Sequence, residues 1–194
     1  MFKKLLVVVI VVASLAGLIG VASALYTSGQ TGNNNVFTSG TVIFTTTDPI
    51  TGTFTLGNMA PDDEVYKPIT VNNVGTLELR YALISAATDA DGLHLNGQLT
   101  MTIKSGITPV NCTNGVFTGG TTLYDGLAFA STVGINVIGN PAPGNQGNDQ
   151  TLAPSDTQNL CLYVKLPRST GNAFQGATTT ATFTFVAEQT ANNP

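Results

Sequence analysis

The residues best suited to covalent chemistry are two cysteines and one histidine. Cys112 and Cys161 are the only cysteines of the 194-residue chain, and His94 is its only histidine. A catalytic cysteine needs a neighbouring base, and His94 is the sole candidate. In an exported chain, two cysteines favour a disulfide. We therefore predict a Cys112–Cys161 bridge, whose loop of about 50 residues would contribute about 4 kcal/mol; two free thiols are the alternative.

Two acidic stretches are the candidates for metal binding. Asp62-Asp63-Glu64 could bind a hard cation, and Asp89-Ala90-Asp91-Gly92 is similar to the start of a calcium loop but lacks the later glutamate. We interpret both as solvated turns. A zinc peptidase would show two histidines at helical spacing with a glutamate between them, whereas His94 stands between Leu93 and Leu95. We predict no catalytic residue, no metal and no cofactor, and hence no enzyme.

One tripeptide matches a modification signal. Asn111-Cys112-Thr113 is a sequon for N-glycosylation. It carries meaning only in an organism that glycosylates such sites, and chance is the alternative.

The composition excludes a nucleic-acid binder. Only 9% of the residues are charged, with 7 Lys+Arg against 11 Asp+Glu, where about a quarter is usual. No basic run exists beyond Lys3-Lys4, so the electrostatic footprint of a DNA- or RNA-binding surface is absent. The length corresponds to one domain.

The first 24 residues have the pattern of a secretory signal peptide. Lys3 and Lys4 precede an apolar run from Leu5 to Val21, and Ala22-Ser23-Ala24 is a small-x-small cleavage signal. We predict cleavage after Ala24 by a signal peptidase and a secreted protein with no membrane segment; an uncleaved anchor is the alternative, since about 20 apolar residues span a bilayer. Loss of Lys3 and Lys4 takes the net charge from −4 to −6.

The remaining chain is predicted to be all β. Apolar and polar residues alternate with the period of two that is typical of half-buried strands, and no helical period is sustained. The clearest apolar sets are Leu77, Leu79, Tyr81 and Leu83; Leu99, Met101 and Ile103; Leu160, Leu162, Val164 and Leu166; and Ala181, Phe183 and Phe185. Shorter candidates are residues 42–44, 53–56, 69–71, 123–124 and 135–138. Eight or more short strands predict an antiparallel two-sheet sandwich, jelly-roll-like, over residues 41–194.

Turn signals separate these strands. Asn96-Gly97 predicts a type I′ hairpin between Leu93–Leu95 and Leu99–Met101. The Pro-, Gly- and Asn-rich stretch 139–156 predicts a long loop inside the domain. A short helical turn over residues 123–130 is left open by the pattern.

Four segments of the mature chain resemble the TasA/camelysin family. They are Ala24–Ser28 with Asn35–Val42; Leu56-Gly57-Asn58-Met59-Ala60-Pro61-Asp62-Asp63; Val71–Tyr81, which contains Asn-Val-Gly-Thr-Leu-Glu-Leu-Arg-Tyr; and Phe174-Gln175-Gly176 with Phe185–Thr190. Their order and combination carry the resemblance. Two departures are Asp62, where the family usually has glycine, and the two cysteines, which the family does not require.

The resemblance implies a jelly-roll subunit of extracellular filaments, as in biofilm matrix fibres and similar archaeal pili. It implies head-to-tail homopolymers in which the N-terminal segment, residues 25–40, adds as a strand to the next subunit. Leu25, Tyr26, Val36 and Phe37 are the apolar side chains that this donor strand could insert. Other matrix proteins are further expected partners. The alternative is a flexible tail, with Val36 and Phe37 pairing in the chain's own sheet.

Two other functions remain as alternatives. Some members of the family carry a metallopeptidase label, so a camelysin-like cell-surface peptidase is one. A monomeric cell-surface binding module or adhesin is the other, although the chain has no tryptophan and its tyrosines, Tyr26, Tyr66, Tyr81, Tyr124 and Tyr163, are dispersed in sequence.

Overall fold

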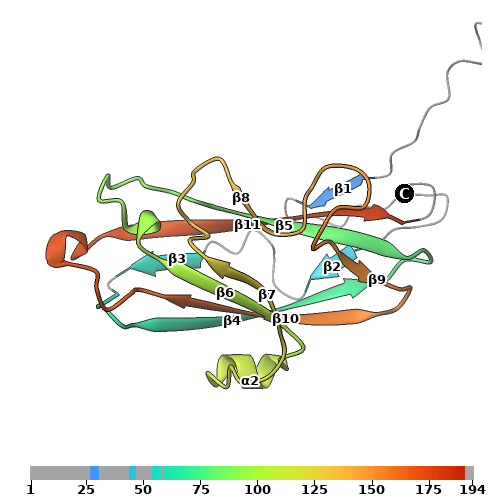
Figure 1. Cartoon of the computed structure of the whole chain (residues 1–194), viewed down its shortest axis with the longest axis horizontal. Helices are drawn as coiled ribbons and strands as arrows, with labels where there is room; N and C mark the ends of the chain where they lie inside the picture. The colour runs from blue at the N-terminus through green and yellow to red at the C-terminus, as the bar shows by residue number, and fades with distance from the viewer. Residues whose placement is uncertain (1–26, 31–43, 47–53, 58, 191–194) are drawn as a thin grey trace, which may run out of the picture.

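The computed structural model describes the chain over residues 27–30, 44–46, 54–57 and 59–190, with side chains over 59–190. The signal segment, the cleavage position after Ala24 and the expected assembly residues Leu25, Tyr26, Val36 and Phe37 lie outside these ranges. The described residues form two antiparallel sheets, A and B, stacked as two layers, and the short helix α2 (Pro109–Thr113) lies on the outer face of sheet B (Figure 1). The predicted all-β antiparallel sandwich is confirmed.

Sheet A has six strands and sheet B has five. In sheet A, β11 (Thr178–Gln189) pairs with β5 (Leu79–Ala87) on one edge. On its other edge it pairs with both β1 (Thr27–Gln30) and β3 (Phe54–Gly57). The far edge of β5 pairs with β8 (Ile135–Ile138) and β9 (Gln150–Leu152). Sheet B has the order β2 (Phe44–Thr46), β4 (Glu64–Asn73), β10 (Thr157–Lys165), β6 (Thr100–Ser105) and β7 (Thr121–Gly126).

The alternating residues of the long strands form the core between the sheets. All four apolar sets expected from the sequence contribute buried side chains to it, from Leu79, Tyr81 and Leu83 in β5 to Phe183 and Phe185 in β11. The buried Tyr81 hydroxyl donates to Gln158, so its polar end has a partner inside the apolar layer. The period of two therefore identified which face of each long strand is buried.

The predicted hairpin at Asn96-Gly97 is wrong. Leu95–Gly97 is a 3-10 turn, η1, and His94 before it is left-handed, with φ 58°. Leu95 is buried in the core, and the Asn96 side-chain amide donates to the Phe129 carbonyl at 3.1 Å. Burial of Leu95 and the hydrogen bond of the Asn96 amide override the local turn preference.

The stretch 139–156 is not one loop, because β9 lies inside it. Leu152 is buried and pairs with Leu79. The preceding turn is held by Asp149, whose carboxylate accepts the Asn140 N–H at 2.8 Å and the Gln146 N–H at 2.9 Å. Residues 123–126 lie in strand β7 rather than in a helical turn.

The α-helix found in the described part of the chain was not predicted from the sequence. It is the single turn α2 (Pro109–Thr113), in which the Thr108 hydroxyl accepts the Asn111 N–H and Pro109 occupies the first turn. Thr followed by Pro is a start signal for helices. The signal was present, but a five-residue helix shows no apolar period. The structure also has a second 3-10 turn, η2 (Asn172–Phe174), before β11.

Gly139 is required by the Asp149 turn. Its φ is +57°, and a Cβ there would lie 2.2 Å from Asp149 Oδ1 and 2.9 Å from Asp149 Cα. Gly139→Ala is therefore expected to lower the free energy of unfolding by about 2 kcal/mol, measured by urea denaturation. Gly147→Ala is the matched control, because a Cβ at Gly147 meets nothing within 4 Å. Equal stability of the two variants would contradict this role of Gly139.

Candidate functional site

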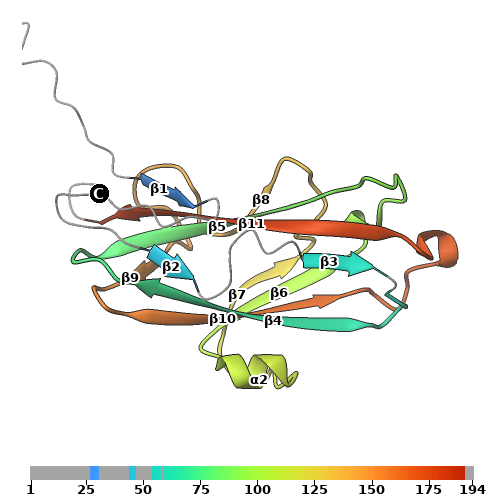
Figure 2. The ribbon, with the colours of Figure 1, turned by 180° about the vertical axis from the view of Figure 1, so that it is seen from behind.

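The outer edge of β11 is completed by two short strands from the N-terminal part of the chain. β3 pairs with Thr178–Ala181, and β1 pairs with Phe185–Glu188. Within the described ranges, β11 residues 182–184 have no strand partner on that edge. Figure 2 shows β1 and β3 at opposite ends of β11. Unpaired strand edges are sites where another chain can add a strand.

Sheet B has the same arrangement on the same side of the sandwich. The four-residue β1 and β3 line the edge of sheet A, and the three-residue β2 lines that of sheet B (Figure 2). β2 pairs only with residues 71–73 of β4. Among the described residues, the Glu64–Thr70 part of β4 pairs with β10 on one edge and has no strand partner on the edge that β2 lines. In the part of the chain that the structure describes, short N-terminal strands thus close this side only in part, along β11 more than along β4.

The strand β1 lies inside the 25–40 segment that was expected to donate a strand. Its Cα partners are Thr27↔Glu188, Ser28↔Ala187, Gly29↔Val186 and Gln30↔Phe185, all in its own chain. From the sequence, the alternative to donation is a flexible tail with Val36 and Phe37 pairing in the chain's own sheet, and residues 27–30 have no assigned partner. The structure gives them one, which shows the edge of β11 that an N-terminal strand fits.

The part of β11 that receives β1 is held from its other sides. Phe185 and Ala187 are buried in the core, and the Phe185 ring packs on Tyr81, with ring centroids 5.8 Å apart. On the outer face, Glu188 pairs with Arg80 of β5 at 2.5 Å and accepts the Gly144 N–H at 3.0 Å. The receiving strand is therefore held by the core, by β5 and by the 139–149 segment, whereas the strand pairing described for β1 involves β11 alone.

The predicted disulfide is confirmed. Cys112 in α2 and Cys161 in β10 are bridged, with Cα atoms 5.6 Å apart, which is ordinary disulfide spacing. With Ile107 they form a small second core on the outer face of sheet B, covered by Tyr66 and Phe117. The bridge thus attaches α2 to the sheet, and neither cysteine is available as a nucleophile.

The residues Asp62 and Glu64 form ion pairs with one lysine. Lys165 Nζ lies 2.6 Å from Asp62 Oδ1 and 3.1 Å from Glu64 Oε1. Glu64 also accepts hydrogen bonds from the hydroxyl of Tyr163 at 2.7 Å and from that of Tyr66 at 3.0 Å. The hydrogen bonds from Tyr163, Lys165 and Tyr66, in this order of size, lower the pKa of Glu64. The carboxylates are therefore already occupied by donors from their own chain.

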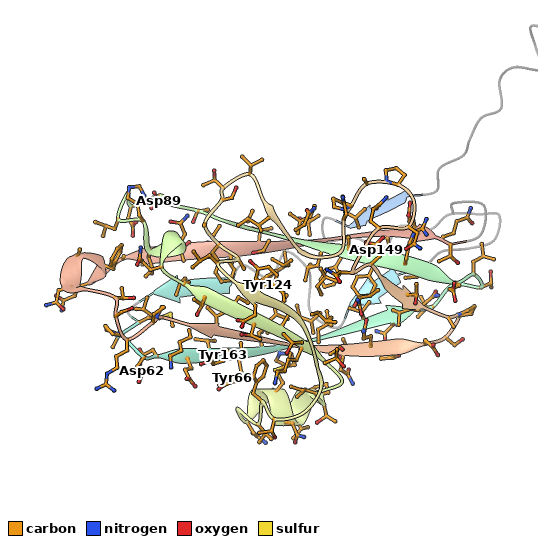
Figure 3. All side chains as sticks on the ribbon, in the orientation of Figure 1. Asp62, Tyr66, Asp89, Tyr124, Asp149 and Tyr163 are labelled. Carbon is orange, nitrogen blue, oxygen red and sulfur yellow. A yellow bond between two sulfur atoms is a disulfide. The ribbon has the colours of Figure 1, made fainter. Side chains whose placement is uncertain are left out.

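Two of the dispersed tyrosines meet in the fold. Tyr66 and Tyr163 are Cα partners across β4 and β10, with ring centroids 5.0 Å apart, and Figure 3 shows them beside α2. Phe117 lies 5.2 Å from the Tyr163 ring, and Lys104 lies 4.6 Å above Phe117. Sequence reasoning missed this cluster, because strand register brings together residues about a hundred positions apart.

Tyr163 is expected to titrate late. Burial, followed by the hydrogen bond to Glu64, raises its pKa to about 12. A tyrosine in the unfolded chain ionises near pH 10. The stability that the raised pKa of Tyr163 contributes is therefore fully present below about pH 10 and is lost as the pH rises to about 12. Spectrophotometric titration at the tyrosinate absorbance should lose a late-titrating group in Tyr163→Phe. In Glu64→Gln that group should titrate earlier, and an unchanged curve in both variants would contradict the assignment.

His94 is a surface residue. Its side chain is 76% exposed, and Nδ1 lies 2.5 Å from Asp89 Oδ2. Asp91 closes the adjoining turn by accepting the Thr178 N–H at 2.6 Å, the first cause of its lowered pKa. Asp62, Asp89 and Asp149 lie in three separate parts of the molecule (Figure 3). Over the described residues, no three His, Cys, Asp or Glu side chains gather as metal ligands.

Two hollows on the described surface are lined mainly by apolar and small polar residues. One of about 310 Å³, lined by Met59, Pro61 and Phe174 among others, contains no His, Cys, Asp or Glu. Another, of about 370 Å³, is lined by Asp89 and otherwise by alanines and threonines, among them Ala86 of β5 and Thr180 of β11. In the described part of the chain no helix is long and apolar enough to cross a membrane.

Comparison with known families identifies the chain as a whole. The family model described as camelysin metallo-endopeptidase matches residues 1–193. The chain belongs to the camelysin family. The resemblance found in its four segments is thereby confirmed, and members of this family are in general cell-surface or secreted proteins.

No curated protein matches this camelysin-family chain. Solved structures give only remote likenesses. A crystal structure of the infectious bursal disease virus VP2 subviral particle is 10% identical, with a TM-score of 0.33, over 87% of this chain and 34% of that one. The PapD-like domain 7 of human CEP192 is 15% identical, with a TM-score of 0.24, over 63% and 66%. This chain thus spans about a third of the viral protein.

The family description implies a catalytic metal, but the side chains of the described residues 59–190 do not fit one. Zinc in a peptidase is held by three protein ligands, with an open position for water. Here the cysteines are bridged, His94 pairs with Asp89, and Asp62 and Glu64 pair with Lys165. We derive no catalytic step for this camelysin-family chain.

Proposed function

We propose that this chain is a secreted structural subunit of extracellular filaments, in which strand β1 of one copy pairs with β11 of the next. The observation that carries the proposal is the β1–β11 ladder, Thr27–Gln30 against Phe185–Glu188, at an open sheet edge. Membership of the camelysin family supports an extracellular setting.

Exchange of β1 between two copies costs little free energy, because it replaces existing residue pairs with identical ones. A sibling's β1 in the same register makes the same four residue pairs as the chain's own β1. Exchange of an identical element costs little, because the hydrogen bonds lost within one subunit are regained between two. Since the donor strand and the receiving edge are different surfaces, one-way exchange leaves a free donor and a free edge at each step. The product is therefore an open head-to-tail filament rather than a closed dimer.

Exchange of β1 affects only one edge of β11. β5 covers the other edge of β11 over nine consecutive pairs, Ala181↔Ala87 to Gln189↔Leu79. β1 therefore leaves without opening the pairing of β11 with the body of sheet A. We expect the subunit core to be the same in the monomer and in the filament.

Deletion of residues 25–35 tests the proposal. The wild-type mature chain, concentrated and viewed by negative-stain electron microscopy, should form filaments, and the deletion variant should remain as single particles. Removal of residues 191–194 is the control and should leave filaments intact. A thermal melt shows that the deletion variant is folded. Normal filaments from a folded deletion variant would refute the strand exchange.

An assay on casein, with and without a chelator, separates this function from the peptidase alternative. A structural subunit should cleave no casein under either condition. Cleavage that the chelator abolishes would instead assign a metallopeptidase, whatever the assembly state.

A further inference from the structure

The loop between β6 and β7 forms a small separate layer on the outer face of sheet B (Figures 1 and 2). The Cys112–Cys161 bridge attaches it, and a Cβ added at Gly115 would contact the Tyr66 ring at 3.4 Å, which shows how closely the loop lies on the sheet. The inner side of this layer is thus fixed covalently and by packing. Its outer side is the part of the loop that other molecules meet.

Asn111 lies in α2 and is exposed to solvent. Its backbone is satisfied, because its N–H donates to the Thr108 hydroxyl at 3.3 Å and its carbonyl accepts the Val116 N–H at 2.8 Å. Its exposed side-chain amide makes no hydrogen bond with the described residues. The amide therefore performs no structural task that a modification would disturb.

The segment that carries Asn111 also exposes two apolar side chains and has a shallow hollow. Val110 is 68% exposed and Val116 is 44% exposed. A shallow hollow of about 250 Å³ beside them is lined by Pro109, Val110, Thr113 and Asn114. Sugar rings offer C–H faces to apolar side chains and hydroxyls to polar ones, and α2 exposes both kinds of group around its sequon.

We propose that Asn111 is the attachment site of an N-linked oligosaccharide. Asn111 is the only asparagine of the whole sequence that is followed two positions later by Ser or Thr. That single sequon lies on an exposed turn of the described fold, rather than within a strand or under the core.

The substrate class is a lipid-linked oligosaccharide. In the transfer, Asn111 Nδ2 forms a bond to C1 of the first sugar while the bond from C1 to the phosphate oxygen of the lipid carrier breaks. The amide proton passes to a base of the transferase, and the lipid phosphate leaves with the bonding electrons. Nothing is oxidised or reduced.

The position of the glycan is compatible with strand exchange. Asn111 lies on the outer face of sheet B, whereas β1 lies on the edge of β11 in sheet A. The first sugars would cover Val110 and the adjoining hollow and would keep this apolar patch from neighbouring molecules. The inference stands apart from the proposed function, since it needs export and a transferase but no filament.

Peptide mass spectrometry of the protein isolated from the cells that make it tests the site. The peptide containing Asn111 should carry added hexose or hexosamine masses. Asn111→Gln and Thr113→Ala should each abolish them, whereas Thr113→Ser, which keeps the sequon, and Asn114→Gln, an exposed neighbour outside it, should keep them. Because Thr113→Ala retains Asn111, the result does not depend on how Asn111→Gln folds. An Asn111 peptide of unmodified mass from the native cells would overturn the proposal.

Discussion

Replacing both Cys112 and Cys161 by alanine is expected to lower the free energy of unfolding by about 4 kcal/mol. The bridge joins residues 49 positions apart, and in the chain-entropy account a loop of this length restricts the unfolded chain by about that amount. Both cysteines are fully buried, so the double variant also loses packing beneath α2. Differential scanning calorimetry should show a fall in Tm of about 10 °C.

The effect belongs to the bridge if a reductant reproduces it. Unfolding the wild-type chain in the presence of dithiothreitol should give the same lower Tm, while the double-alanine variant should be insensitive to the reagent. A loss of less than about 1 kcal/mol in the variant would contradict the stabilising role of the bridge.

The Glu188→Gln variant is expected to lose about 3–5 kcal/mol of stability. The Arg80 and Glu188 side chains are 6% and 8% exposed and lie 2.5 Å apart across β5 and β11. Removing one charge of a buried pair takes away an ion pair while the other charge stays desolvated, which costs more than the pair itself contributes. Chemical denaturation measures the loss, with Lys104→Gln as a charge-removing control at a half-buried position.

A double variant separates the charge from the packing. Arg80→Met combined with Glu188→Gln removes both charges and keeps an acceptor for the Gly144 N–H, which Glu188 now binds. We expect the double variant to recover at least half of the stability that Glu188→Gln loses. The single variant Arg80→Met completes the cycle, and a double-variant loss equal to the sum of the two single-variant losses would show that the pair is not coupled.

The long strands could be predicted because their side chains alternate between a buried and an open face. Leu160, Leu162, Val164 and Leu166 are all buried, as their spacing indicates, and the same holds for Leu99, Met101 and Ile103. A pattern of period two is a property of each strand alone, so it is legible without knowing its neighbours.

The failures occur where a neighbour decides the local structure. Asn96-Gly97 has the ordinary sequence of a hairpin, but the Phe129 carbonyl takes the Asn96 amide and the core takes Leu95. β9 was missed because its three residues are a strand only by pairing with β5. Pairing partners are tertiary information, which local propensity does not contain.

The candidate site divides in the same way. The N-terminal segment was singled out because it is polar and has little to bury, and its family resemblance gave it a role as a donor strand. Its docking at Phe185–Glu188 depends on β11 having a free outer edge, which only the sheet order reveals. The Glu64, Lys165 and Tyr163 cluster was likewise hidden, because register alone brings β4 beside β10.

The most direct test of the filament account is a cross-link between two different molecules. Ser28 of β1 and Ala187 of β11 are Cα partners, and positions paired in this way lie about 4.5–5.5 Å apart, within reach of a disulfide. Two variants, Ser28→Cys and Ala187→Cys, are mixed, assembled and mildly oxidised. The native cysteines are already bridged and buried, so they do not compete.

The account predicts a covalent dimer containing one copy of each variant on a non-reducing gel of the filaments. The pair Ser28→Cys with Thr182→Cys, displaced along the same strand, should give none. Filaments that contain both variants but no cross-link between positions 28 and 187 would contradict the exchange of β1 between neighbouring subunits.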